Sequence, residues 1–373
     1  MSTLRYEVKY KIDNKLGPIS CLAFSAEGQT LAVGSHSLIT LWDMDTGRSP
    51  LVYDGKSEVT CLEWGPNNTL YCGYESGFLT ATKVDVLRQE WVTVGYQAST
   101  APLTSISVHQ AGTHLAIATD GGVGLWVLNS ASGDWQHRKT LESPAVNDVG
   151  PVKVTSLFWP STEVSNINTI IISYAHHGVI VWSLEPQEQK FALSHLRILS
   201  GASLSADGKL FAVSNMQQGF DVYSIESGVH VRTFREHDCS SETQPFPALF
   251  IQGGKWLLGG GIGKATIWHV GSGTQVQVLL NDGELTHPVQ HLAATYHCAA
   301  HGERFQIATA SDRGRTISLW RAQAIGTKVE LPYSGAIEVR RHPRVVWKWV
   351  FSMIIVCIAG ALYYIDNFAT FRI

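Results

Sequence analysis

The sequence has few charged side chains and almost no excess of either sign. Charged residues make up 16% of the 373 residues, below the roughly 25% of an ordinary soluble domain. Lys and Arg number 28 against 31 Asp and Glu, so the formal net charge is -3. Such a chain has no global positive field to hold a phosphate backbone, and we expect no nucleic acid partner.

Cysteine is also scarce, and its spacing excludes the common thiol motifs. The six cysteines include no C-x-x-C pair, so a disulfide framework is not expected. The densest group of possible metal ligands is His287, His291, His297, Cys298 and His301. Because that spacing matches no zinc signature, we expect no bound metal and take surface or strand packing as the role of these residues.

Motifs of catalysis and nucleotide binding are missing as well. The segment 259–266 resembles a phosphate-binding loop, but Leu258 stands where the first Gly belongs and Ala265 replaces the metal-binding hydroxyl. It also falls between two predicted strands, whereas a phosphate needs the start of a helix. No Ser-His-Asp or paired-carboxylate arrangement stands out. We therefore expect no enzyme and no cofactor.

The two ends of the chain differ in their apolar content. Residues 1–11 carry charges throughout and lack the apolar core of a secretory signal. Residues 349–365 contain no charged side chain. As a helix, residues 345–365 would cover about 30 Å, the thickness of the hydrocarbon core of a bilayer. We expect a transmembrane helix at 345–365, with a buried helix of a globular domain as the alternative.

The flanks of this apolar run predict its orientation. Trp347 and Trp349 before it and Tyr363 and Tyr364 within its last turn are placed as an aromatic belt. The positive-inside rule then keeps the long N-terminal part cytoplasmic, through the basic residues Arg340, Arg341, Arg344 and Lys348. A short tail, residues 366–373, crosses the membrane, as in tail-anchored proteins. The expected location is the endoplasmic reticulum or the outer mitochondrial membrane.

A repeat runs through residues 1–321. Short apolar segments end in an aromatic residue at one recurring position, which is occupied by Trp42, Trp126, Trp182, Tyr223, Trp268 and Trp320, and by Thr82 in one further copy. Successive positions lie 40, 44, 56, 41, 45 and 52 residues apart, close to the roughly 40–45 residues of a four-stranded propeller blade. We predict an all-β fold, a seven-bladed β-propeller.

The earlier strands of each blade are also visible. Apolar runs at 19–24, 59–64, 103–108, 154–159 and 289–294 are predicted to be innermost strands. The last blade has only three strands before residue 321, and the alternating segment 4–12 is a spare strand that would complete it. A propeller closed in this way leaves no open edge between the first and last blades.

On these residues the chain resembles the WD40-repeat family over about residues 4–322, with the name-giving dipeptide present once, at Trp42-Asp43. The Gly-His that opens most repeats of that family is nearly absent. The resemblance implies structural hydrogen-bonded sets, of which Asp120 with Trp126 and Asp312 with Trp320 are partial copies. Individual blades are therefore expected to be less stable than those of the family.

The same resemblance implies where a partner binds. In this fold the turns inside the second hairpin of each blade and the links between blades share one face. The turns mix charges with aromatic and sulfur groups, which favours a protein or peptide partner. The candidate residues of this face are His36, Tyr74, Glu75, His176, His177, Met216, Gln217, Lys264, Arg313 and Arg315. For each, the alternative is an ordinary solvated loop.

The sequence therefore predicts a membrane-tethered scaffold that recruits cytosolic protein partners without catalysis. Residues 322–344 would link the propeller to the anchor. A second hypothesis is a Sec12-like exchange factor for a small GTPase at the endoplasmic reticulum, because a cytosolic propeller followed by one C-terminal anchor is similar in layout. The partner and the oligomeric state are not predicted.

Overall fold

The computed structural model describes residues 4–48, 51–85, 90–144, 150–160, 168–193, 201–215, 219–235, 246–281, 287–299, 302–311 and 315–324. The chain divides into two units, Met1–Ile337 and Glu338–Ile373, and every described residue lies in the first. The predicted span, tail, aromatic belt and basic cluster lie outside the described residues. Among those described, no helix has the length and apolar character needed to cross a bilayer.

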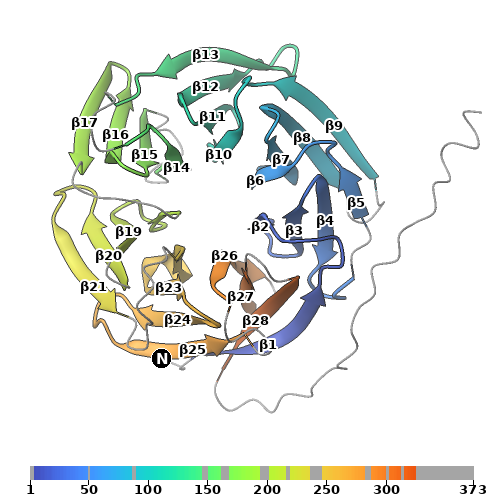
Figure 1. Cartoon of the computed structure of the whole chain (residues 1–373), viewed down its shortest axis with the longest axis vertical. Coiled ribbons are helices and arrows are strands. Elements are labelled where there is room, and N and C mark those ends of the chain that lie inside the picture. Colours follow the sequence, from blue (N-terminus) through green and yellow to red (C-terminus); the bar gives the residue numbers. More distant parts are fainter. Residues whose placement is uncertain are drawn as a thin grey trace, which may run out of the picture. The chain divides into compact units, whose positions relative to one another are not determined.

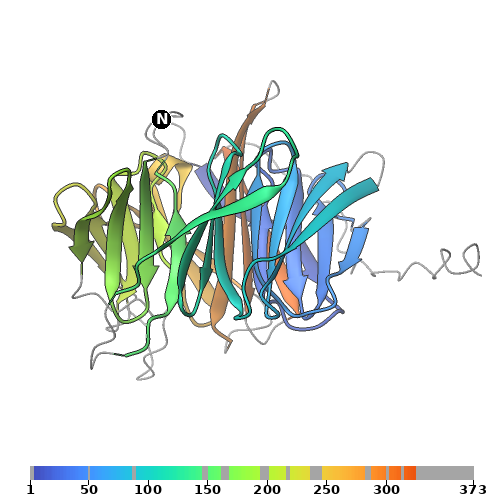
Figure 2. The ribbon, with the colours of Figure 1, turned by 90° about the horizontal axis from the view of Figure 1, so that it is seen from above.

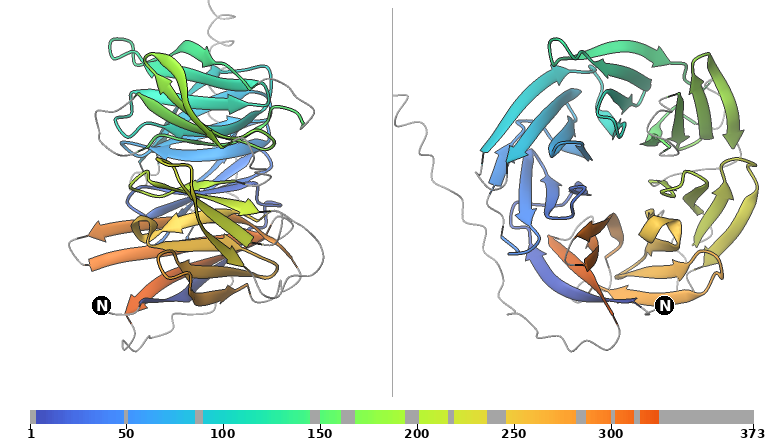
Figure 3. Two further views of the ribbon diagram at one scale, coloured as in Figure 1. Left: turned by 90° about the vertical axis from the view of Figure 1, so that its left-hand side faces the viewer. Right: turned by 180° about the vertical axis from the view of Figure 1, so that it is seen from behind.

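The described strands form seven sheets of four antiparallel strands each, arranged as blades around one axis (Figures 1 and 3). Blade 1 is β2 (Cys21–Phe24), β3 (Thr30–Ser35), β4 (Leu38–Asp43) and β5 (Leu51–Asp54). Blade 2 is β6 (Val59–Gly65), β7 (Thr69–Tyr74), β8 (Phe78–Asp85) and β9 (Glu90–Gln97). Blade 3 is β10 (Leu103–Val108), β11 (His114–Thr119), β12 (Gly122–Leu128) and β13 (Trp135–Leu141).

The remaining blades follow the same order, from the innermost strand outward. Blade 4 is β14 (Val154–Phe158), β15 (Thr169–Tyr174), β16 (Gly178–Leu184) and β17 (Gln187–Leu193). Blade 5 is β18 (Ser203–Leu204), β19 (Leu210–Asn215), β20 (Gly219–Ser224) and β21 (His230–Arg235). Blade 6 is β22 (Ala248–Ile251), β23 (Trp256–Gly260), β24 (Lys264–His269) and β25 (Gln275–Leu280), with one 3-10 turn, η1 (Gln252–Gly254). Blade 7 is β26 (Val289–Ala299), β27 (Gly302–Ser311), β28 (Thr316–Ala324) and β1 (Leu4–Asp13).

This architecture confirms the predicted seven-bladed, all-β propeller. The recurring aromatic position has the same register in every blade: Trp42 lies opposite Leu31, and Trp320 lies opposite Ile307. Thr82, the exception, lies opposite Leu70. The pattern in the sequence therefore reports one repeated position on the third strand of each blade.

Ring closure also follows the prediction. β1 pairs with β28 in antiparallel register, from Leu4 opposite Ala324 to Asp13 opposite Thr316. Gln277 of blade 6 binds both polar backbone atoms of Tyr6: its Oε1 accepts from the Tyr6 amide at 2.8 Å and its Nε2 donates to the Tyr6 carbonyl at 2.6 Å. The first strand of the chain thus completes the last blade and also contacts the blade before it.

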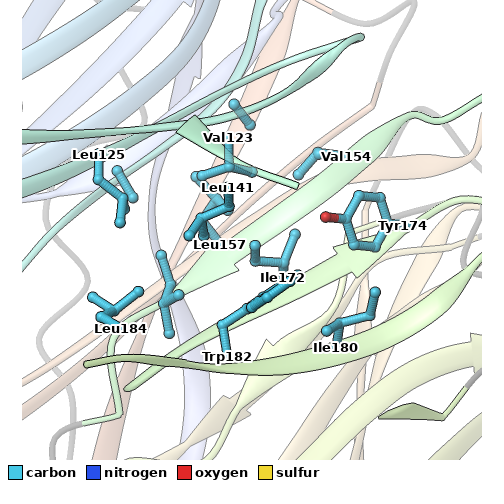
Figure 4. Close-up of a cluster of buried hydrophobic side chains, with 13 residues drawn as sticks. Val123, Leu125, Leu141, Val154, Leu157, Ile172, Tyr174, Ile180, Trp182 and Leu184 are labelled. Atoms are coloured by element: carbon cyan, nitrogen blue, oxygen red, sulfur yellow. The ribbon is translucent and has the colours of Figure 1, made fainter. Parts of the chain in front are cut away.

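The apolar core lies between neighbouring blades, because each sheet packs against the preceding blade on one face and the following blade on the other. One cluster joins blades 3 and 4, and Figure 4 shows its side chains from both blades, among them Leu125, Leu141, Leu157 and Trp182. Similar clusters join blades 1 and 2, 2 and 3, 4 and 5, 5 and 6, and 6 and 7. Contacts between successive blades therefore stabilise the ring.

The strand order defines two faces of the ring, seen edge-on in Figure 2. We call the face that carries the links between blades and the turns between second and third strands the link face. The face that carries the turns between first and second strands and between third and fourth strands is the turn face. The sequence-based candidate residues belong to the link face.

Blade 2 is packed less completely than its neighbours. Thr82 is buried but is far smaller than the tryptophan of other blades, and its Oγ1 lies 3.0 Å from that of Thr93. A small apolar cavity of about 20 Å³ lies beside it, lined by Leu41, Cys72 and Trp91 among others. The missing ring thus leaves space between blades 1 and 2.

The expected hydrogen-bonded sets are only partly present. Trp320 Nε1 donates to Thr309 Oγ1 at 3.1 Å, and Thr309 in turn donates to Asn281 Oδ1 at 2.9 Å. Asn281, on the link after blade 6, thus provides an acceptor that the sequence analysis missed; Asp312 lies outside the described residues. Asp120 is exposed, and among the described contacts Trp126 packs edge-on against His137 instead, with ring centroids 5.3 Å apart.

Candidate functional site

The link-face candidates differ in accessibility. His36, Glu75 and Arg315 are exposed on turns between second and third strands, while His176 and Lys264 are half-buried. Met216, Gln217 and Arg313 lie outside the described residues. The structure therefore distributes the accessible candidates over several blades, and their role in partner binding stays a prediction.

Two of the predicted contact residues are interior side chains, which corrects the sequence analysis. Tyr74 ends β7 with no exposed surface, and its hydroxyl lies 3.1 Å from Thr80 Oγ1. Its ring lies where a Cβ on residue 55 would be, so Gly55 makes room for it. His177 is 7% exposed and packs edge-on against Tyr174. Neither offers a surface to a partner, because both side chains are buried.

A large cleft in the described part of the chain lies on the turn face, where no candidate had been placed. We call it the blade 3–4 cleft; its volume is about 880 Å³. Its lining comes from both blades: His114, Leu125, Trp126, Val127, Asn129, Gln136, Arg138 and Lys139 of blade 3, and Trp159, Asn168, Leu184 and Glu185 of blade 4. A volume of this size is typical of sites that bind ligands or peptide side chains.

Trp159 holds the two sides of this cleft together. It follows the innermost strand of blade 4, and its Nε1 donates to the carbonyl of Ser107 in blade 3 at 3.1 Å. Its ring packs edge-on against His109 and His114, with centroids 5.5 and 6.4 Å away. Burial lowers the pKa of both histidines, and the nearby His109 lowers the pKa of His114 further. Both rings are therefore biased toward the neutral form.

The outer wall of the cleft is basic. Lys139 donates to the carbonyl of Leu184 across the blade boundary at 2.7 Å. Arg138 is exposed and makes no hydrogen bond or ion pair with any described residue. Trp126 is half-buried beside them. Tryptophan and arginine are the side chains most enriched in the centres of protein interfaces.

A second cleft lies on the turn face between blades 1 and 2, and a tryptophan again connects its two sides. We call it the blade 1–2 cleft; its volume is about 680 Å³. Trp64 is the last residue but one of β6, and its Nε1 donates to the carbonyl of Ala23 in the preceding blade, also at 3.1 Å. The full lining is Ser25, Glu27, Gln29, Thr30, Asp43, Asp45, Trp64, Asn67, Asn68, Lys83, Val84, Asp85, Glu90, Trp91 and Val92.

The charge of this second cleft is opposite. Five carboxylates line it against one lysine: Glu27, Asp43, Asp45, Asp85 and Glu90 with Lys83. One oxygen of Asp43 accepts three hydrogen bonds in its own turn, from the amide of Asp45 and from the amide and hydroxyl of Thr46. Glu27 and Glu90 are exposed and have no partner among the described residues.

Both clefts are marked in the sequence by a tryptophan at one position of the innermost strand, which the repeat pattern alone did not single out. At the position of Trp64 and Trp159, the other innermost strands have Phe24, Val108, Leu204, Phe250 and Ala294. Tryptophan thus stands there in blades 2 and 4 alone. Both residues were included in the predicted innermost strands, but the pattern did not show that their rings reach back to the preceding blade.

The described residues give no sign of a metal-binding cluster. They contain no group of three or more His, Cys, Asp or Glu side chains that could hold a metal ion. The side chains of His297, Cys298 and His301 lie outside the described set. Burial raises the pKa of Cys21 and Cys61 to about 12, which leaves these thiols protonated and poor nucleophiles. The glycine-rich segment 259–266 forms the hairpin of β23 and β24, as expected.

The family comparison agrees with the fold. Residues 8–43 match the family model described as WD domain, G-beta repeat. The matched segment runs from β1 through β4 and ends at the Trp42-Asp43 dipeptide. No curated protein matches the chain. The protein therefore carries a WD40 repeat within a seven-bladed β-propeller, an architecture that suggests a protein-interaction scaffold.

Proposed function

We propose that the protein is a membrane-tethered scaffold whose propeller recruits cytosolic protein partners and performs no catalysis. The observation that carries this proposal is the blade 3–4 cleft. It joins an exposed Arg138 with the half-buried rings of Trp126 and Trp159 in a space of about 880 Å³. This combination suits an interface with a protein, since aromatic rings supply contact area and arginine supplies directed hydrogen bonds.

The tether in this proposal is the apolar run 345–365, with the propeller on the cytoplasmic side of the endoplasmic reticulum or the outer mitochondrial membrane. Attachment to a membrane would raise the local concentration of whatever the propeller binds. The exchange-factor hypothesis rests on layout alone, and no feature of either cleft favours it.

Protease protection tests the tether. The full chain is tagged at both ends, membranes are isolated and treated with protease, and a chain ending at Arg340 serves as the control. We expect digestion of the N-terminal tag, protection of the C-terminal tag and a soluble truncated chain. A protected propeller would invert the topology and overturn the proposal of a cytosolic scaffold.

Proximity labelling from the full-length protein tests recruitment. Arg138→Glu reverses the exposed charge of the blade 3–4 cleft, and Arg235→Glu makes the same change at the end of β21, far along the chain. We expect the first substitution to remove labelled partners that the second retains. An identical set of partners for both variants and the unmodified protein would show that this cleft does not recruit them.

A further inference from the structure

We infer that the blade 1–2 cleft binds an extended segment of a partner protein in which Lys or Arg side chains flank an apolar one. The inference deepens the proposed function and rests on it, because it gives the chemistry of one partner. It concerns a different surface from the blade 3–4 cleft, so the two can be tested separately.

The shape of the cleft suits a peptide. Its volume of about 680 Å³ is enough for a few side chains. Trp64 spans its base from blade 2 to blade 1 through the bond to the Ala23 carbonyl. Thr30 and Val84 beside it are buried. These fixed residues make the base of the cleft a preformed surface, which reduces the ordering cost of binding.

The charge of the lining indicates which kind of peptide the cleft would bind. Five carboxylates and one lysine face this space in a chain whose total formal charge is only -3. A lining in which carboxylates outnumber basic groups attracts a cationic segment. Glu27 reaches the cleft from blade 1 and Glu90 from blade 2, so both walls contribute a carboxylate.

Exposed apolar side chains supply the second part of the surface. Trp91 is 40% exposed and Val92 is 69% exposed, and both line the cleft. They belong to β9, the outermost strand of blade 2. A tryptophan face attracts Lys and Arg through its π-electrons, and the exposed valine favours an apolar neighbour. This pair distinguishes the cleft from a merely acidic surface.

A comparison with the blade 3–4 cleft shows why we infer a basic segment for the blade 1–2 cleft. In the blade 3–4 cleft the outer strand β13 contributes Arg138 and Lys139, which would repel a cationic segment. In blade 1 the corresponding strand, β5, is four residues long and contributes no side chain to the cleft. No side chain of β5 therefore adds a basic group to the lining of this cleft.

Fluorescence anisotropy of labelled ten-residue peptides tests the inference on the purified full-length chain in detergent. One probe contains Lys and Arg around a central Leu, and the reference probe has Glu in place of each basic residue. We expect the basic probe alone to bind, with affinity that falls when NaCl is raised from about 50 mM to about 500 mM. Binding of both probes, or of neither, would overturn the inference.

Matched variants locate the binding. Glu27→Gln with Glu90→Gln is expected to weaken binding about fivefold, and Trp91→Ala about threefold. Lys83→Gln is expected to strengthen it about twofold, because it removes the one like charge. The control, Glu142→Gln with Glu188→Gln, changes the net charge equally on blades 3 and 4.

Equal weakening by the control pair would mean that the peptide responds to total charge, and the inference would be wrong. If the unmodified chain does not bind the basic peptide but partners are still recruited in the proximity assay, the inference would be rejected and the proposed scaffold function would stand. Recruitment that fails in every variant and in the unmodified chain would reject the proposed function itself.

Discussion

The blade 1–2 cleft and the blade 3–4 cleft share one frame and differ in their lining. In both, a tryptophan at the end of the innermost strand donates to a carbonyl of the preceding blade at 3.1 Å. In both, an asparagine carbonyl before the second strand accepts from the end of the third: Asn68 from Val84 and Asn168 from Leu184. The backbone of the repeat is therefore preserved where the side chains have diverged.

The divergence lies in the outer strands and the turns. Long β13 places Arg138 and Lys139 along one cleft, while short β5 leaves the other to the carboxylates of its turns. A repeat fold can thus present opposite charge at equivalent places without changing its core. Substitutions that act on the shared frame should damage both clefts, and substitutions in the lining should affect one.

Deletion of residues 1–13 should have the largest effect, because it acts on the whole ring. Without β1, the edge of β28 is exposed and the contacts of Tyr6 with Gln277 are lost. We expect a loss of more than about 5 kcal/mol, enough to unfold a typical domain and both clefts with it. Thermal unfolding followed by circular dichroism measures this. A truncated protein that melts like the full chain would show that closure is not essential.

The two cleft tryptophans come next and allow a direct comparison. Trp159→Ala should cost about 3 kcal/mol and Trp64→Ala about 2 kcal/mol, because both rings are half-buried. Trp159 should cost more since it also packs against His109 and His114. Denaturant unfolding gives the values, with Trp→Phe at each site as the control that keeps a ring and loses one hydrogen bond. A larger cost at Trp64 would contradict the packing argument.

Glu63, next to Trp64, should show a smaller and pH-dependent effect. Burial raises its pKa to about 7, although the amide of Val108 donates to it and opposes the shift. The unfolded chain loses this proton near pH 4.5, so the stability that the protonated form provides falls as pH rises from there through about 7. Glu63→Gln should therefore stabilise the protein by about 2 kcal/mol at pH 8 and leave it unchanged at pH 4.

The residue of blade 4 that is equivalent to Glu63 is apolar. Phe158 precedes Trp159 and packs edge-on against Phe211, with centroids 5.9 Å apart. Glu63 occupies the same place in blade 2, where burial disfavours its charged form. Glu58→Gln, at an exposed site, serves as the control in urea titrations at both pH values. Equal stability of the Glu63 variant and the unmodified protein at pH 8 would refute the assignment.

The smallest effect concerns the histidines of the blade 3–4 cleft. Burial lowers the pKa of His114, so the unfolded chain binds its proton first as the pH falls below about 6.5. Stability should therefore decrease on acidification through that window, by less than about 1 kcal/mol for this partly exposed ring. His114→Gln should remove the part of this decrease that its own ring causes and leave the part from His109, whose pKa burial also lowers, whereas His36→Gln, on the link face, should leave the whole decrease in place. Urea midpoints between pH 7 and 5 give the comparison.

The extent of prediction from sequence varied with the range of the interactions. The aromatic positions marked the third strands of all seven blades, because a blade repeats its hydrophobic pattern locally. Strand β22 and the two-residue strand β18 did not emerge from the apolar runs, since they are short and follow long links. Tyr74 was assigned to the surface because it follows a strand, yet it turns inward into the space that Gly55 provides.

The sequence by itself determined the number of blades, the repeated aromatic position and the use of the first strand to close the ring. These depend on periodicity and on pairing between short β-segments, which the order of residues expresses directly. Only the tertiary structure decided that Trp64 and Trp159 reach back to the preceding blade and that acidic and basic linings occupy equivalent clefts. Those features join residues about 40 to 60 positions apart across a blade boundary, where the twist of two packed sheets, and not the local pattern, sets which side chains meet.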